Sequence, residues 1–550
     1  MFIPATKEEA AAAGIKQPDV VLITGDAYID APSVGISVIG HVLIDAGFKV
    51  CIIAQPAGED ICRFGEPRLF WGVTAGAMDS MVSNYNADRS RRRQDDLSPE
   101  GGGTKRPDRA CIAYTNLIRR YYKNTAPVIL GGLEASLRRI AHYDYWQNKV
   151  RRSVLFDAKA DAIVYGMGEL SMVELANRIA AGKPWQDING ICYAAGEPPQ
   201  DAIILPSYEE VCENKAAFWE MFKAFAANAD AAYGRRLAQQ HGDRWLVQNP
   251  PARDLTSEEL DRVYEFPYER DVHPAWGRLG RVRALDTIRF SITTHRGCAG
   301  GCSFCSIAVH QGKSVISRSE ESIIREAERL AAHRMFRGTI SDVGGPTANM
   351  YGASCLAGGC ARKLCLGQKI CPKFAVNHGR QIALLAKIAD IAGVKHAFVA
   401  SGIRYDLVLA DKQHCKEYLQ QLAARHISGL LRVAPEHTAS KVLALMGKPK
   451  AEALIAFTDM FADVAPTGMG LSYYFMAAHP GCTLADMRSL SARFKGGAPA
   501  SVQIFTPTPS TLSTAMYYTG TDALGNPIFV ERDMGRKQKQ KRTAADRFRQ

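Results

Sequence analysis

The chain has 550 residues and a net charge of +12, with 68 Lys and Arg against 56 Asp and Glu. This length predicts two or three domains, and the lack of a signal peptide and of any apolar run of about 18 residues argues for a cytoplasmic protein without membrane spans. The 14 cysteines therefore indicate metal ligation or buried thiols rather than a disulfide framework.

Residues 1–204 are predicted to form a doubly wound parallel sheet, an α/β fold. Ligands bind beyond the carboxyl ends of the strands in such sheets, so Gly131, Gly132, Gly166 and Gly168 mark a candidate ligand site, with ordinary turns as the alternative. Apolar runs of strand type alternate there with helical patterns, namely VVLITGD (20–26), KVCIIAQP (49–56), LFWGVTAG (69–76), APVILGG (126–132) and DAIVYGMGE (161–169).

Three other segments show no such alternation. Residues 89–109 are charged, glycine-rich and poor in apolar side chains, which is typical of a long surface loop. Residues 205–282 are interpreted as a connector that packs on both domains. The C-terminal segment 511–550 ends in GRKQKQKRTAADRFRQ, for which a disordered basic tail is expected and a nucleic-acid arm is the alternative.

A regular pattern returns over residues 283–510. Its strands alternate with helical patterns, which predicts a partial (β/α)6 barrel of the TIM type with its chemistry on the loops after the strands. The six strand candidates are IRFSITT (288–294), GTISDVGG (338–345), HAFVASG (396–402), GLLRVAPE (429–436), LSYYFMAAHP (471–480) and SVQIFTPTP (501–509).

Three cysteines follow the first of these strands, in RGCAGGCSFCSI. Cys298, Cys302 and Cys305 can converge on one metal centre because the glycines between them allow tight turns. Three thiolates leave one iron of a 4Fe-4S cluster open for a cofactor or substrate, whereas a structural site is closed. A zinc loop with a distant fourth ligand is the alternative. Phe304 adds an apolar wall beside the last cysteine.

This CxxxCx-aromatic-C pattern resembles the signature of the radical S-adenosylmethionine superfamily. The resemblance implies that the open iron binds S-adenosylmethionine and that its reductive cleavage gives a 5′-deoxyadenosyl radical. It also implies an electron donor of the flavodoxin or ferredoxin type. Over nearly its whole length the chain is similar to the YgiQ family, through strings such as GDAYIDAPSVG, DVGGPTANMYG and RVAPEHTASKVLALMGKP.

The same resemblance implies contacts to S-adenosylmethionine. Gly344 and Gly345 match the place of the family's Gly-Gly-Glu motif, although Pro346 stands where the acid is expected, and a plain turn is the alternative. Arg432 and Glu436 stand where the family often places polar contacts to this cofactor. An ion pair inside the barrel is the alternative for these two residues.

The N-terminal sheet is similar to the cobalamin-binding domain of other radical S-adenosylmethionine enzymes, through PVILGGLEAS and DAIVYGMGELSMVELA. The lower-ligand motif Asp-x-His-x-x-Gly is absent, and residues 1–40 contain no His. Bound cobalamin is therefore not expected, although a cobalamin without a protein ligand, or a vestigial fold with another ligand, stays open.

A second group of cysteines follows the second barrel strand. Four thiols so close together indicate a second metal site, either an auxiliary iron-sulfur cluster or a structural zinc, with unligated thiols as the alternative. The group consists of Cys355, Cys360, Cys365 and Cys371.

These patterns predict a radical S-adenosylmethionine enzyme of unknown substrate, with RNA as one open substrate class. The alternative is a basic nucleic-acid-binding protein with structural metal sites, suggested by the net charge and the arginines at 89–93. His437 and His479 lie at strand ends and are open between action on substrate and hydrogen bonding within loops. No catalytic residue is assigned.

Overall fold

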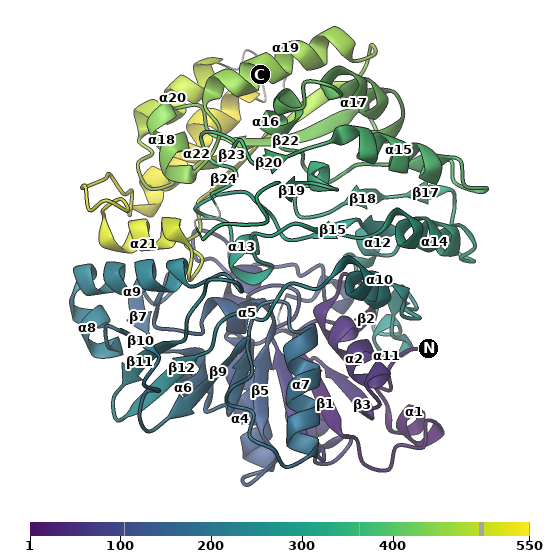
Figure 1. The fold of residues 1–550 in the computed structure, drawn as a ribbon, viewed down its shortest axis with the longest axis vertical. Coiled ribbons are helices and arrows are strands. Elements are labelled where there is room, and N and C mark those ends of the chain that lie inside the picture. Colours follow the sequence, from purple (N-terminus) through teal and green to yellow (C-terminus); the bar gives the residue numbers. More distant parts are fainter. Residues whose placement is uncertain (104, 362–363, 494–499, 549–550) are drawn as a thin grey trace. The chain divides into compact units, whose positions relative to one another are not determined.

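The computed structural model describes residues 1–103, 105–361, 364–493 and 500–548 (Figure 1). The chain divides into two compact units. The first comprises Met1–Asp254, Phe266–Arg289 and Thr508–Ser510, and the second comprises Leu255–Glu265, Phe290–Pro507 and Thr511–Gln550. Each unit is built around its own set of parallel strands.

The first unit contains a nine-stranded sheet in the order β10-β11-β12-β9-β8-β5-β4-β1-β3. Its parallel part confirms the predicted doubly wound sheet, because β1 lies between β3 and β4 and the strand order reverses there. The parallel strands are β1 (Val20–Thr24), β3 (Val50–Ala54), β4 (Phe70–Thr74), β5 (Val128–Gly131) and β8 (Ala162–Val164).

Helices cover both faces of parallel strands in such folds, which explains why the strands read as unbroken apolar runs. All five residues of β1 and all five of β3 are buried. Helices α2 (Gly35–Asp45) and α7 (Glu169–Ala180) share one core with these strands, in which Leu43 and Leu175 pack with Leu22.

The expected connector over residues 205–282 is not a separate piece. Strands β10 (Ile203–Leu205), β11 (Leu237–His241) and β12 (Arg244–Gln248) extend the first sheet beyond β9 (Ile191–Ala195), and only α10 (Ser257–Glu265) belongs to the second unit. The apolar pattern hides β11 and β12 because they bury glutamines. The Gln239 side chain accepts from the Ala141 amide at 2.9 Å, and the Gln248 side chain accepts from Arg139 Nε at 3.0 Å.

The second unit confirms the predicted six-stranded barrel. Neighbours along the chain pair in parallel: β14 (Ser291–Thr293) with β18 (Asp342–Gly344), and β17 (Thr339–Ile340) with β21 (His396–Ala397). A single parallel bridge from Ile403 to Val433 continues the order to β22 (Leu430–Glu436). The last strands are β23 (Gly470–Ala477) and β24 (Ala500–Ile504). Helices α14 (Glu320–Ala331), α15 (His378–Ala389), α17 (Cys415–Gln421) and α19 (Ala451–Val464) alternate with them.

The expected disordered tail is instead helix α22 (Met534–Phe548), which packs on α20 (Leu484–Arg493) and β24. Lys537, Gln540 and Ala544 are buried along one side of this helix. The Gln540 side chain accepts from the Ala478 amide at 3.0 Å and donates to the Cys482 carbonyl at 3.3 Å. The basic composition predicted disorder because it does not show that this helix buries polar side chains whose hydrogen bonds are satisfied.

The described helices are short. The longest, α22, has 15 residues, whereas a membrane span needs about 20 apolar residues. None of the helices in the described part of the chain has the length and apolar character to cross a membrane.

Candidate functional site

The barrel strands of the second unit have one buried face and one accessible face. Side chains alternate along a strand, and Ile292, Val343 and Val433 lie buried on one face. The residues between them on the other face are polar and at least partly exposed, and they include Thr293, Asp342, Arg432, Ser472 and Gln503. The accessible face of this barrel is therefore suited to bind a polar molecule.

The loop over residues 297–305 follows the first barrel strand and is fixed by three neighbouring segments. The amide of Cys298 donates to the Gly312 carbonyl at 3.3 Å, that of Gly301 to the Leu366 carbonyl at 2.7 Å, and that of Ser303 to the Met446 carbonyl at 3.0 Å. Gly297 has a φ of 78°, and a side chain there would overlap the Ser314 carbonyl. This loop therefore requires glycine at residue 297.

The three predicted cluster ligands come together on this loop. A Cβ atom at Gly300 would lie 3.2 Å from the sulfur of Cys298 and 3.7 Å from that of Cys302, so glycine leaves both thiols free to face one point. Burial, followed by the electrostatic effect of the two neighbouring cysteines, raises the pKa of Cys305 to about 12. A metal that replaces the protons would relieve this crowding of sulfurs.

In the described part of the chain, no three His, Cys, Asp or Glu side chains are placed to hold a single metal ion. A lone zinc needs all its ligands within about 2.3 Å of one point, whereas the thiolates of a 4Fe-4S cluster bind different irons.

Arg404 is a charged neighbour of these thiols that the sequence interpretation missed. Its Nη1 donates to the sulfur of Cys302 at 3.8 Å, and the Thr347 hydroxyl lies 3.4 Å from the sulfur of Cys298. Burial lowers the pKa of Arg404, but Asp406 and then the two cysteines outweigh this effect and raise it. The sequence does contain a signal for this residue, because SGIRYD places Arg404 and Asp406 directly after the third barrel strand.

His479 lies beside Phe304 of the cysteine loop. Their ring centroids are 6.2 Å apart, and His479 is fully buried, which lowers its pKa to about 3. The imidazole donates from Nδ1 to the Pro480 carbonyl and accepts at Nε2 from the Ser513 hydroxyl at 2.6 Å. That hydroxyl also lies 2.8 Å from the Ser303 hydroxyl, so His479 supports the loop.

Gly344 and Gly345 end the second strand. A Cβ atom at Gly345 would lie 2.5 Å from the ring of His295, so close packing by itself requires this glycine. The Gly344 carbonyl accepts from the Thr294 amide at 2.7 Å. Their role in binding S-adenosylmethionine stays a prediction.

Arg432 and Glu436 differ in their surroundings although both lie on β22. Arg432 is exposed on the accessible face of the barrel, and no ion pair joins it to Glu436 among the described contacts. Glu436 is 5% exposed, has a φ of 66°, and leaves its Oε2 without a hydrogen-bond partner. Burial raises the pKa of Glu436 to about 7, although Lys448 acts in the opposite direction. Backbone strain and an unpaired buried carboxyl oxygen are typical of binding and catalytic sites.

His437, the next residue, accepts at Nδ1 from the amides of Thr438 and Ala439, each at 2.9 Å. Its Nε2 lies 3.5 Å from the sulfur of Cys482. These contacts give His437 a role in shaping the turn that precedes α18 (Ser440–Met446).

The second cysteine group lies on a loop that contacts the first. Leu366 bridges to Gly300, and Cys298 and Cys365 pack against the same small apolar cluster. Cys360 is exposed and the other three cysteines are half-buried. Residues 362–363 lie outside the described part of the chain, and the second metal site stays a prediction.

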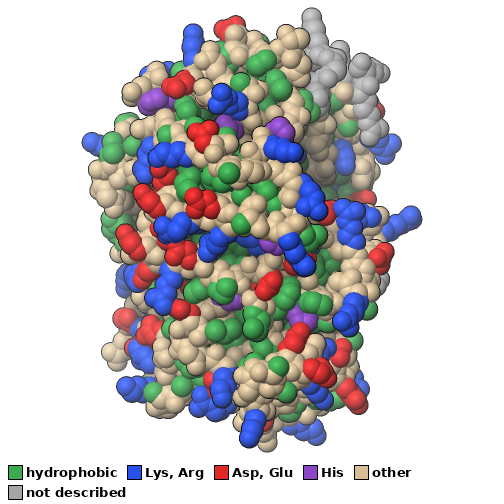
Figure 2. All heavy atoms as spheres, turned by 90° about the vertical axis from the view of Figure 1, so that its right-hand side faces the viewer, with side chains coloured by type: hydrophobic (Ala, Val, Ile, Leu, Met, Phe, Trp, Pro, Cys, Tyr) green, Lys and Arg blue, Asp and Glu red, His purple; other side chains and the backbone are tan. Residues whose placement is uncertain are grey.

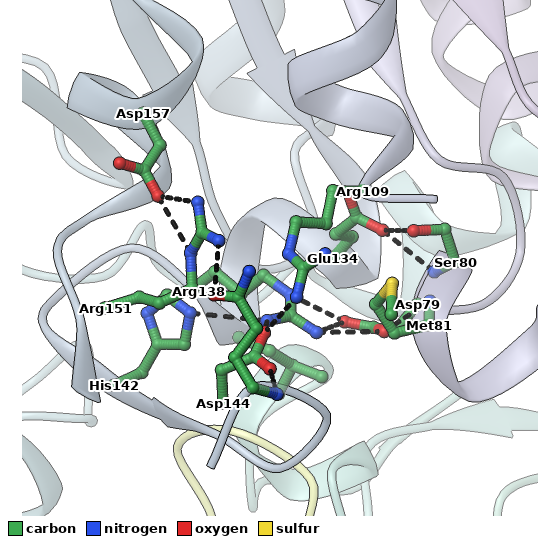
Figure 3. Close-up of polar contacts among 12 residues, drawn as sticks. Asp79, Ser80, Met81, Arg109, Glu134, Arg138, His142, Asp144, Arg151 and Asp157 are labelled. Carbon is green, nitrogen blue, oxygen red and sulfur yellow. Dashed lines mark hydrogen bonds and ion pairs between the residues drawn. The ribbon is translucent and has the colours of Figure 1, made fainter. Parts of the chain in front are cut away.

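A buried ionic network fills part of the carboxyl edge of the first unit's sheet (Figure 3). The Arg138 guanidinium donates to both carboxylate oxygens of Asp79 and lies 3.4 Å from Asp144. The Glu134 carboxylate accepts from the amides of Ser80 and Cys111 at 2.8 and 3.0 Å. The network ties the loops after β4 and β5 together.

Two of the four glycines predicted to bind a ligand at this edge also have packing roles. A Cβ atom at Gly132 would overlap the Thr74 hydroxyl, and one at Gly168 would lie 3.0 Å from Val164. Gly131, Gly132, Gly166 and Gly168 are nevertheless half-exposed at the ends of buried strands.

Arginines of the 89–93 loop contact other groups of the first unit. Arg89 lies over the ring of Tyr145 at 4.5 Å, and Arg92 donates to the Tyr85 carbonyl at 3.1 Å. Figure 2 shows Lys and Arg interspersed with Asp and Glu on the face that it presents. The nucleic-acid alternative gains no support from these features.

Two family models match the chain. The model described as Radical SAM N-terminal matches residues 2–291, and that described as Radical SAM superfamily matches residues 292–492. A UPF0313 protein of Fusobacterium nucleatum is 48% identical, with 98% of each chain covered. A UPF0313 protein of Methanocella arvoryzae is 47% identical, with 96% of this chain and 90% of that protein covered.

Two solved structures share the fold. One is the radical S-adenosylmethionine methyltransferase TsrM from Kitasatospora setae with cobalamin and a 4Fe-4S cluster bound, at a TM-score of 0.51 and 16% identity over 90% of this chain and 77% of TsrM. The other is the cobalamin-dependent enzyme OxsB with aqua-cobalamin and S-adenosylmethionine bound, at a TM-score of 0.51 and 12% identity over 90% of this chain and 54% of OxsB.

These structures correct the expectation that cobalamin is absent. That expectation relied on the missing Asp-x-His-x-x-Gly motif. It was wrong, because TsrM and OxsB, which have a similar fold, both contain cobalamin. The motif supplies only an axial imidazole, whereas a parallel sheet presents its carboxyl edge to a ligand with or without it.

The pKa of Glu436 leads to a prediction about stability. The folded protein holds the Glu436 proton up to about pH 7, whereas the ordinary value is 4.5, so the folded state binds more protons between these values. The free energy of unfolding should fall by about 3 kcal/mol as the pH rises from 4.5 to 7. Glu436→Gln should lack this component in denaturation experiments across that range.

The exposed Glu452 offers a matched control, since Glu452→Gln should retain the wild-type pH dependence. Parallel curves for wild type and Glu436→Gln would contradict the assignment of a buried, protonated carboxyl group.

Proposed function

The chain belongs to the UPF0313 family of radical S-adenosylmethionine enzymes, and on that basis we propose that Cys298, Cys302 and Cys305 hold its 4Fe-4S cluster. The expected YgiQ family is the same family, so that prediction is confirmed. When bound, such a cluster supplies the electron that cleaves S-adenosylmethionine to a 5′-deoxyadenosyl radical, which abstracts hydrogen from a substrate still to be identified.

The closeness of the Cys298 and Cys302 thiols beside Gly300, together with the electrostatic effect of both on Cys305, carries this proposal. Three thiolates leave a cluster one protein ligand short of four, so one iron is open to a small chelating molecule. The loop follows the first strand of the barrel, and chemistry in barrels of this kind lies on the loops after the strands. The neighbouring accessible face supplies polar groups for the rest of the cofactor.

Five further residues are proposed to line S-adenosylmethionine. Gly344 and Gly345 end the strand next to the cysteine loop, where a polypeptide backbone without side chains lets a ligand approach. Arg432 offers an exposed guanidinium, and Glu436 offers an unpaired carboxyl oxygen. Phe304 contributes an aromatic wall, and a flavodoxin- or ferredoxin-type protein is the proposed electron donor.

Single replacement of Cys298, Cys302 or Cys305 by Ala tests the proposal. Each variant should lose the visible cluster absorbance and should reduce 5′-deoxyadenosine formation to background, because each thiolate is a ligand. The assay is anaerobic incubation of reconstituted protein with S-adenosylmethionine and dithionite. Cys415→Ala, on α17, should behave as wild type. A variant that kept a full cluster and full cleavage would remove its cysteine from the site.

A second metal at Cys355, Cys360, Cys365 and Cys371 is a further part of the proposal. The support is their density together with the packing of this loop on the cluster loop through Leu366. Metal analysis of a Cys298, Cys302, Cys305 triple-Ala variant isolates the group. About four irons per chain would indicate an auxiliary cluster and one zinc a structural site, whereas no metal after anaerobic reconstitution would refute the prediction.

Cobalamin is the ligand proposed for the first unit, on its likeness to TsrM and OxsB. The half-exposed backbone at Gly131 and Gly166 fits a ligand at the sheet edge. His142 at this edge is engaged with the Ile140 carbonyl and lies 3.3 Å from Arg138, so cobalt would lack that imidazole as a ligand. Protein from cobalamin-fed cells should contain about one cobalt per chain. Cobalt-free protein that also fails to bind added cobalamin would exclude this ligand.

A further inference from the structure

Arg404 stands out as a buried cation in contact with a proposed cluster ligand. It follows the third barrel strand, precedes α16 (Tyr405–Ala410), and is 7% exposed. Its Nη1 lies 3.8 Å from the sulfur of Cys302. The same nitrogen would lie 3.3 Å from a Cβ atom at Gly300, the point that Cys298 and Cys302 also face.

The guanidinium is held from its far side. Nε of Arg404 donates to Asp406 Oδ1 at 3.0 Å, and Nη2 donates to Asp406 Oδ2 at 2.8 Å. This bidentate pair fixes the plane of the guanidinium and leaves Nη1 to face the sulfur. A lysine could not reproduce the fork, because its ammonium is a single point of charge.

The backbone of Arg404 is clamped as well. The Asn349 side chain accepts from the Arg404 amide at 2.8 Å and donates to the Arg404 carbonyl at 3.0 Å. Asn349 also lies 3.1 Å from Nε2 of His378, whose Nδ1 lies 2.9 Å from Asp411. Since a carboxylate only accepts, the proton is on Nδ1, and Nε2 accepts from the Asn349 amide.

Burying the charged guanidinium of Arg404 with Asp406 adds little to the stability of the fold. A buried ion pair gains little over apolar residues of the same size, because both charges lose their hydration. Here the carboxylate lies behind the guanidinium, so the cation is directed at the sulfurs. A cluster gains negative charge when it takes up one electron, and a cation or N–H donor beside its sulfurs stabilises that reduced form.

We propose that Arg404, aligned by Asp406 and Asn349, raises the reduction potential of the cluster bound by Cys298, Cys302 and Cys305. The proposal rests on the proposed function of these cysteines. The step is the transfer of one electron from a low-potential donor protein to the oxidised cluster, and no covalent bond is made or broken. Arg404 acts through the cluster and is therefore a positioning residue.

The test is a redox titration of reconstituted protein, followed by the electron paramagnetic resonance signal of the reduced cluster. In Arg404→Gln the equilibrium constant for reduction should fall about tenfold, which corresponds to about 59 mV for one electron. Asp406→Asn keeps a side-chain oxygen that can accept from Arg404 but removes a negative charge near the same cluster, so its potential should not fall below that of the wild type. A purely structural ion pair would shift both variants in the same direction.

Iron and sulfide analysis distinguishes the failure of this inference from that of the proposed function. A wild-type protein that binds no cluster would overturn the function of the cysteines. A wild type with a full cluster and an Arg404→Gln variant of unchanged potential would overturn the role of Arg404 alone. If Arg404→Gln loses its cluster, Arg404→Lys, which keeps the charge, should keep the cluster, and its potential should fall below that of the wild type by less than the about 59 mV expected when the charge is lost. Loss of the cluster in Arg404→Lys too would refute the inference.

Discussion

The site of the second unit depends on the close packing of the cysteine loop, residues 297–305, against the segments that contain Leu366 and Gly447. Gly301 packs on the Leu366 carbonyl, to which a Cβ atom would approach within 2.6 Å, and a side chain at Gly447 would overlap the Gly301 carbonyl. The loop is thereby wedged between the segment after the second strand and the end of α18. A residue with a side chain at Gly301 or Gly447 would displace the cysteine sulfurs, because a close-packed interior cannot accommodate added volume without shifts.

Two buried cations, Lys448 and Arg404, lie near the cysteine loop. Lys448 is 6% exposed and favours the charged forms of both Cys305 and Glu436, so one ammonium group serves the cysteine loop and the end of the fourth strand. Arg404 serves the loop from the end of the third strand. Both cations lie near sulfurs that a metal would render anionic. Arg404 is paired with the buried Asp406, and Lys448 acts electrostatically on the buried Glu436. This pattern concentrates charge where the barrel's strands end.

The first unit uses buried charge differently. Arg138 pairs with Asp79 and Asp144, Arg106 pairs with Asp26 and Asp95, and all six side chains are buried. Removal of one partner from such a set leaves an unpaired buried charge, which is strongly destabilising. These sets hold the loops at the carboxyl edge of the sheet in place.

The sequence by itself determined the features that depend on neighbours along the chain. The apolar runs of the five parallel strands and of the barrel strands, and the spacing of Cys298, Cys302 and Cys305 among glycines, are local patterns with direct physical causes. Only the tertiary structure decided which polar groups meet. Arg404 reaches Cys302 across 102 residues, and Gln540 reaches Cys482 across 58. Strands β11 and β12 and helix α22 were likewise hidden, because their buried Gln239, Gln248 and Gln540 are satisfied by hydrogen bonds that hydrophobic periodicity does not register.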